Sequence, residues 1–163
     1  MSQPRAGWGE FTASAPDLAA TAHRLLQRGE ATASAFLATV SAAGMPRLHP
    51  VFPVLTDDAL WLFIVEMSPK YGDLIANGRF ALHALPPEGG GEELALQGHA
   101  THVLDSATRE RVVESTGGRQ GVHAFEQLFR CELGTVLHTR WSNWGTANAW
   151  PAYEKWRAAA RAD

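Results

Sequence analysis

The sequence has little of what would tie it to export, to a membrane or to a nucleic acid. Cys131 is the single cysteine in 163 residues, so no disulfide can form within the chain and no paired-cysteine metal site is available. A reducing compartment, the cytoplasm, is therefore expected. No apolar run reaches the roughly 18 residues that a membrane helix needs, and residues 1–5 lack the apolar core of a signal peptide.

Charge is scarce as well. Charged residues make up 19% of the chain and the formal net charge is −3, which lacks the basic footprint of a nucleic-acid-binding protein. We expect neither a nucleic-acid partner nor a membrane partner. Hydrophobic residues make up 45%, a value typical of globular proteins, and the length suits a single domain over residues 1–163.

Short apolar runs separated by turn residues predict a β structure for most of the chain. The runs that read as strands cover residues 35–40, 47–55, 59–65, 79–85, 94–103 and 134–141. Strands joined by tight turns favour an antiparallel sheet. Six strands with glycine and proline interruptions suit a small closed barrel, so the predicted class is mainly β with flanking helices.

The two ends of the chain read differently from the middle. Residues 1–15 read as an N-terminal arm. After Pro16, an apolar stripe of helical spacing predicts a helix that stops at Gly29. Pro151 can open a last helix, so a C-terminal helix is expected over residues 148–163. Gly98, inside the fifth strand, predicts a bulge or a close backbone approach.

The second predicted strand holds the first candidate site. Pro50 and Pro53 interrupt it, which indicates either a strand beside a local opening in the sheet or an ordinary edge strand. Alternation along the strand places Arg47 and His49 on the face away from the core. A partner or an anionic ligand such as a phosphate would explain this pair, and a plain solvated face is the alternative. The residues expected to face the core are Leu48, Pro50, Phe52 and Val54.

A second candidate site follows the strongest strand. Ser68, Pro69 and Lys70 precede a short predicted helix. A helix N-terminus, a hydroxyl and a lysine can together bind an anion, because backbone N–H groups and the cation face the same ligand. The alternative is a serine that caps the helix beside a surface lysine.

Histidines and tryptophans supply further candidates. His83 and His99 could meet across neighbouring strands, but none of the seven histidines has a spacing that demands a metal, and we expect no metal site. Four of the six tryptophans, among them Trp141, lie in the last 23 residues. They either pack under the terminal helix or form the wall of a site for a flat ring.

No phosphate loop, nucleophile elbow or catalytic triad is evident. The catalytic residues therefore stay unassigned, and the reactive group of an enzyme of this kind would belong to a cofactor. His49 is the best candidate acid or base, because its ordinary pKa lies near neutrality.

The order of these pieces resembles a known family. Gly44-Met45-Pro46-Arg47-Leu48-His49-Pro50-Val51, then Ser68-Pro69-Lys70, then Arg79-Phe80-Ala81-Leu82 resemble the pyridoxamine 5′-phosphate oxidase-like, FMN-binding split-barrel superfamily. The resemblance covers residues 33 to about 103 and is weaker as far as Trp141. It implies a six-stranded antiparallel split β-barrel and a homodimer with two cofactor sites across its interface.

The resemblance also implies roles for individual residues. Arg47, Ser68 and Lys70 would bind the phosphate of FMN. The ring would lie along two segments, formed by His49, Pro50 and Val51 and by Ile64, Val65 and Glu66. Gln97 and Trp141 would come from the second subunit.

Departures from the family pattern limit what the resemblance implies. The oxidase itself carries an arginine and histidine motif that Leu137-His138-Thr139-Arg140 matches only faintly, so pyridoxamine phosphate oxidation is not expected. Pro69 and Glu66 make the phosphate pocket less positive. The function expected is an FMN-dependent oxidoreductase with a small-molecule substrate or electron donor. The alternatives are a deazaflavin-dependent reductase and a non-catalytic module that binds flavin or haem.

Overall fold

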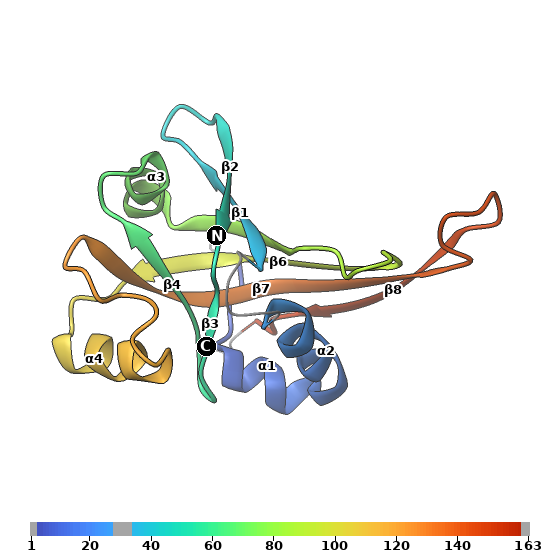
Figure 1. Cartoon of the computed structure of the whole chain (residues 1–163), viewed down its shortest axis with the longest axis horizontal. Helices are drawn as coiled ribbons and strands as arrows, with labels where there is room; N and C mark the ends of the chain where they lie inside the picture. The colour runs from blue at the N-terminus through green and yellow to red at the C-terminus, as the bar shows by residue number, and fades with distance from the viewer. Residues whose placement is uncertain (1–2, 28–33, 161–163) are drawn as a thin grey trace.

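The computed structural model describes residues 3–27 and 34–160. It folds into one curled antiparallel sheet flanked by helices (Figure 1). The helices are α1 (Trp8–Ser14), α2 (Pro16–Leu26), α3 (Pro69–Asn77) and α4 (Ser106–Ser115). The strands are β1 (Ala35–Val40), β2 (Pro46–Val51), β3 (Val54–Leu55), β4 (Leu60–Val65), β5 (Arg79–Ala84), β6 (Glu92–His102), β7 (Glu126–Ser142) and β8 (Trp150–Arg157). None of the helices in the described residues is long and apolar enough to cross a membrane.

The sheet runs in the order β2-β1-β5-β6-β7-β4-β3, and β8 also pairs with β7. The 17-residue strand β7 changes its partner along its length: residues 126–131 pair with β4, and residues 135–142 pair with β8. Ala6 pairs with Leu133, which lies between these two parts of β7. The two backbones exchange two hydrogen bonds, of 2.9 and 2.8 Å. The N-terminal segment is thereby fixed to the middle of the sheet.

Alternating residues of the strands build the core. Leu37, Leu82 and Leu96 are buried on the inner face of the sheet, as expected for a period of two residues. Apolar residues of α1 and α2, among them Phe11 and Leu25, belong to the same cluster. A smaller cluster forms where Val112 of α4 packs near β4 and β7.

The predicted mainly β class and antiparallel sheet are confirmed, but the sheet has eight strands rather than six. The segment 47–55 divides into β2 and β3 at Phe52 and Pro53, where proline cannot donate a ladder hydrogen bond. The second extra strand is β8. The prediction of a helix over 148–163 is wrong, because eight residues from Trp150 to Arg157 pair with β7 instead. Residues 161–163 lie outside the described residues.

The prediction for the N-terminal arm also needs a correction. Residues 8–14 form helix α1, and both Trp8 and Phe11 are buried in contact with each other, with ring centroids 5.4 Å apart. The predicted helix after Pro16 is confirmed as α2, while its predicted stop at Gly29 lies outside the described residues. The bulge predicted at Gly98 is confirmed by a register shift there. A Cβ atom at Gly98 would overlap the carbonyl oxygen of Glu132.

The faces of β2 are the reverse of the prediction. In the antiparallel register, Arg47 lies opposite Thr39 and His49 lies opposite Leu37, both of which face inward. Leu48 points outward and is 64% exposed. The prediction that Arg47 and His49 share one face of β2 and Leu48 and Pro50 share the other is correct. The apolar face, however, is the outer one. The inner side ends in a polar corner beneath α3.

Helix α3 is fixed to this corner by Asp73. Its carboxylate accepts a 2.8 Å hydrogen bond from the Thr39 hydroxyl and lies 3.1 Å from Nε of Arg47. The Asp73 side chain is only 7% exposed. Asn77 adds a 2.7 Å hydrogen bond from its amide to the carbonyl of Val40. These contacts join α3 to β1 and β2, which are remote from it in sequence.

This arrangement predicts that Asp73→Ala destabilises the fold by about 1–3 kcal/mol, because it leaves a buried hydroxyl and a guanidinium without their acceptor. Asp57→Ala, at an exposed position in a turn, is the matched control and should change the free energy of unfolding little. Urea denaturation of both variants measures the difference. Equal stability of the two variants would contradict the structural role of Asp73.

Candidate functional site

The candidate site lies where the curl of the sheet brings its two ends together. Strand β2 is one end of the strand order, and β4 with β3 is the other. Lys70 follows β4 at the start of α3, whereas Arg47 and His49 lie on β2. The charges of Lys70 and Arg47 both act on the His49 ring, and Figure 1 shows α3 beside β2 and beyond the end of β4. We call Arg47, His49 and Lys70 the cationic corner.

Arg47 is the outermost member of the cationic corner. Its side chain is 41% exposed, and its Nε atom is held by Asp73. A guanidinium carries five N–H donors in a planar fork, so anchoring Nε leaves the terminal nitrogens available. The strand thus presents the end of Arg47 in a fixed orientation toward a ligand.

His49 is half-buried, and its Nε2 atom is buried with no hydrogen-bond partner in the described part of the chain. Burial lowers the pKa of His49, and the positive charges of Lys70 and Arg47 lower it further, against an opposing effect of Asp73. The imidazole is therefore neutral at pH 7. A buried, unpaired ring nitrogen is costly, so a hydrogen-bonding group that reached Nε2 would be favoured.

Lys70 is also half-buried, and burial lowers the pKa of its amine. Within the described residues, no carboxylate lies within ion-pair distance of it. Ser68 occupies the N-cap position of α3, but its hydroxyl donates a 2.6 Å hydrogen bond to the carbonyl of Val65 and makes no cap bond. The interpretation of Ser68 as a side-chain cap is therefore wrong, because the preceding turn takes its hydroxyl.

The remaining predicted contacts differ in how accessible they are. The side chains of Val51 and Ile64 are buried in the core, so only their backbones could border a ligand. Pro50 points outward beside Leu48. Glu66 is exposed and accepts a 3.1 Å hydrogen bond from Gln127, which directs its charge to a neighbouring amide.

Gln97 and Trp141 are not part of the cationic corner within one chain. Gln97 lies on the outer face and accepts a 3.3 Å hydrogen bond from Thr135. Trp141 lies against Trp144, with ring centroids 5.7 Å apart, and its indole nitrogen is buried without a partner in the described residues. Their assignment to a second subunit stays a prediction.

The histidines do not converge. His83 lies opposite Ala95, whereas His99 lies opposite Arg79, so the predicted meeting of His83 and His99 is wrong by four residues of register. His99 and His102 are three residues apart on β6 and face opposite sides of it. No group of three or more histidine, cysteine, aspartate or glutamate residues in the described ranges could hold a metal ion.

Two polar clusters were missed by the sequence analysis. One is the Asp73–Thr39 pair, whose only signals were a threonine in an apolar strand and an acid in a short helix. The other joins Glu92 to His138 at 3.1 Å and to Arg24 at 2.8 Å. Both depend on contacts between residues more than 30 positions apart, which local patterns do not reveal.

Comparisons with known proteins identify the family and the fold of the chain. A family model described as pyridoxamine 5′-phosphate oxidase matches residues 23–140. A search of the curated proteins finds no match. The solved structures that resemble the chain include an F420 reductase, with 19% identity and a TM-score of 0.55 over 70% of this chain and 94% of that chain.

Two other solved structures have the same fold. The haem storage protein HutZ from Vibrio cholerae has 18% identity and a TM-score of 0.52, over 71% of this chain and 89% of that chain. PhzG from Burkholderia lata 383, solved with tetrahydrophenazine-1-carboxylic acid, has 11% identity and a TM-score of 0.56, over 91% of this chain and 92% of that chain. Such identities show a shared fold, and the family model covers most of the sequence. The chain therefore belongs to the pyridoxamine 5′-phosphate oxidase family and has its split-barrel fold.

Proposed function

We propose that the cationic corner binds the phosphate of FMN and that the protein is a flavin-dependent oxidoreductase acting on a small molecule. The observation that carries this proposal is the gathering of Arg47, His49 and Lys70 from the two ends of the sheet. One carboxylate, that of Asp73, lies among them and pairs with Arg47, whereas Lys70 has no ion-pair partner in the described residues. The corner thus retains positive charge for an anionic tail.

The half-buried state of Lys70 supports an anionic ligand. Burial penalises its charged form, and a bound phosphate would offset that penalty through a charge-assisted hydrogen bond. The N-terminus of the nine-residue helix α3 adds backbone N–H groups at the same place. His49 supplies the unpaired Nε2 atom.

The flavin, when bound, supplies hydride or electron transfer. The residues of this chain would hold and orient it, with Arg47 fixed by Asp73 and Lys70 balancing the phosphate charge. The lowered pKa of His49 favours its neutral form, so the ring can take part in a hydrogen bond to the ligand through Nε2.

The similar structures favour two alternatives for the cofactor. One of them is an F420 reductase and another is a haem storage protein, so the same fold accommodates a deazaflavin or a haem. The absorption spectrum of the protein titrated with FMN, F420 and haem separates these cases. Flavin bands retained after gel filtration support the proposal, whereas a Soret band or selective retention of F420 supports an alternative. Retention of none of the three would contradict cofactor binding.

We also propose that the protein is a homodimer formed through the outer face of β1 and β2. Phe36 is 36% exposed and Leu48 is 64% exposed, and both point outward from neighbouring strands. Ala38 and Pro50 lie directly opposite them in the register. Contiguous exposed apolar groups of this kind mark interaction surfaces.

Lys70→Ala is predicted to weaken FMN binding by about 1–3 kcal/mol, the scale of a lost charged hydrogen bond. Lys155→Ala is the matched control, because Lys155 is exposed on β8 and should leave the affinity unchanged. Quenching of flavin fluorescence measures both dissociation constants. Unchanged affinity in the Lys70 variant would reject the phosphate assignment.

Leu48→Asp is predicted to raise the dimer dissociation constant by more than about tenfold, since burying a leucine is worth about 1.5–3 kcal/mol. Leu104→Asp introduces the same charge at a position that is 84% exposed in a loop, and it should leave the association intact. Sedimentation velocity over a concentration series compares the two variants. A monomeric unmodified protein, or equal association of both variants, would refute this interface.

A further inference from the structure

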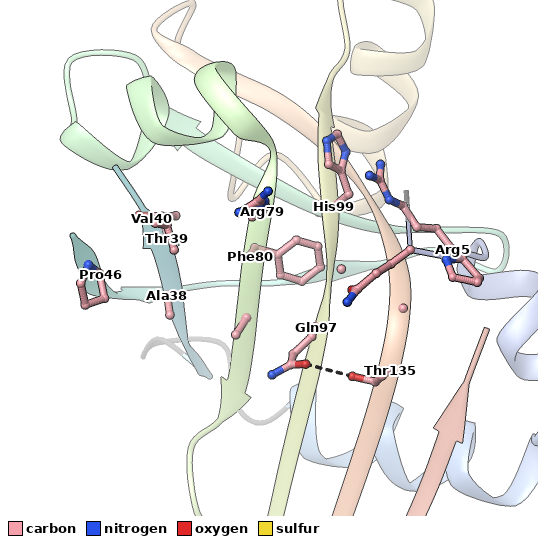
Figure 2. Close-up of a pocket in the computed structure, with 15 residues that line it drawn as sticks. Arg5, Ala38, Thr39, Val40, Pro46, Arg79, Phe80, Gln97, His99 and Thr135 are labelled. Atoms are coloured by element: carbon pink, nitrogen blue, oxygen red, sulfur yellow. Dashed lines mark hydrogen bonds between the residues drawn. The ribbon is translucent and has the colours of Figure 1, made fainter. Parts of the chain in front are cut away.

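A pocket of about 610 Å³ lies on the outer face of the sheet, across β1, β5, β6 and β7. Ala38, Ala81, Gln97 and Thr135 follow one another across these strands. The N-terminal residues 3–5 form one rim (Figure 2). Its volume lies in the range of small-molecule sites. The side chains of the cationic corner face the other side of the sheet.

Positive charge gathers at one end of this pocket. Arg5, Arg79 and His99 line it, and its lining contains no aspartate or glutamate. Arg79 and His99 are direct neighbours in the β5–β6 register. This is unexpected in a chain whose net charge is −3. Among the described residues, no carboxylate lies within ion-pair distance of Arg5 or Arg79.

His99 provides an independent sign of a ligand. Its Nδ1 atom is buried and has no hydrogen-bond partner in the described ranges. The ring packs against Gly78, where an added Cβ atom would overlap it. Burial lowers the pKa of His99, and Arg5 lowers it further against an opposing effect of Glu132. In the tautomer that carries its proton on Nδ1, the neutral ring can donate a hydrogen bond to an oxyanion beside the two arginines.

One side of the pocket is apolar, whereas Gln97 and Thr135 add polar groups on the other. Ala38, Val40, Pro46 and Ala81 line the side toward β1, so a ligand that fills the volume needs an apolar body as well as an anionic group. Arg5 is kept in place by the hydrogen bonds of the adjacent Ala6 with Leu133. The site is therefore assembled from the rigid sheet and a segment fixed to it.

We propose that this pocket binds a small organic anion, with its carboxylate or phosphate between Arg5, Arg79 and His99 and its apolar body against β1 and β5. The site is separate from the cationic corner and does not depend on FMN binding there. Because it shares the outer face with Phe36 and Leu48, a dimer formed through that face would place the pocket at the subunit boundary.

Isothermal titration calorimetry of the full chain with benzoate and with phenyl phosphate tests the proposal, and the two probes distinguish the two anionic groups. Arg79→Gln and Arg5→Gln should each raise the dissociation constant at least about tenfold. Arg130→Gln is the matched control, because Arg130 is an exposed arginine whose guanidinium lies over the Trp61 ring, 5.7 Å from its centroid. It should leave the affinity unchanged. In ¹⁵N-histidine spectra, the Nδ1 signal of His99 should shift on addition of the probe.

Four results would overturn the proposal. The first is that neither probe binds the unmodified protein. The second is that Arg79→Gln binds the probe as tightly as Arg130→Gln does. The third is that Lys70→Ala abolishes binding of the probe, which would place the probe in the cationic corner. A fourth result, loss of self-association in Arg79→Gln with no probe binding to the unmodified protein, would mean that a carboxylate of the second copy occupies the pocket, and it would also reject the proposal. Each result is independent of whether FMN binds.

Discussion

The Asp73 carboxylate is the contact on which the arrangement of the candidate site depends. It joins α3 to Thr39 of β1 and to Arg47 of β2, so it connects the segment after β4 with the opposite end of the sheet. Together with the hydrogen bond from Asn77 to Val40, it links the segment that carries Lys70 to the strand that carries Arg47. With it, the curl of the sheet is closed at one corner, and the cations lie near each other with His49 between elements that are far apart in sequence.

The two faces of the sheet carry different chemistry, and the two-residue period of the strands separates them. The inner face of β2 contributes Arg47 and His49 to the cationic corner, whereas its outer face exposes Leu48. Further along that outer face, Arg79 and His99 border the second pocket. One sheet thus presents a polar inner corner, an apolar patch and an outer cationic pocket. We interpret these as a cofactor site, a subunit interface and a binding site for an organic anion.

Local patterns in the sequence were sufficient for part of this structure. The strands around residues 35–40 and 59–65 were predicted because their apolar runs are short and bounded by turns, and the order of the motifs identified the family. The C-terminal helix was wrong, since pairing with β7 outweighed the proline signal at residue 151. The faces of β2 were reversed, because an apolar side that is exposed in the folded chain has the same sequence pattern as a side that faces the core. Asp73 and Arg5 could not be recognised, since their importance comes from contacts with distant strands.

The relative affinity of the unmodified protein for FMN and riboflavin tests the central claim most directly, because the two ligands differ only by the phosphate. If the cationic corner holds that group, FMN should bind at least about tenfold more tightly, as expected from charged hydrogen bonds of about 1.5–3 kcal/mol. Added salt should reduce the preference. Equal dissociation constants for FMN and riboflavin would contradict the account.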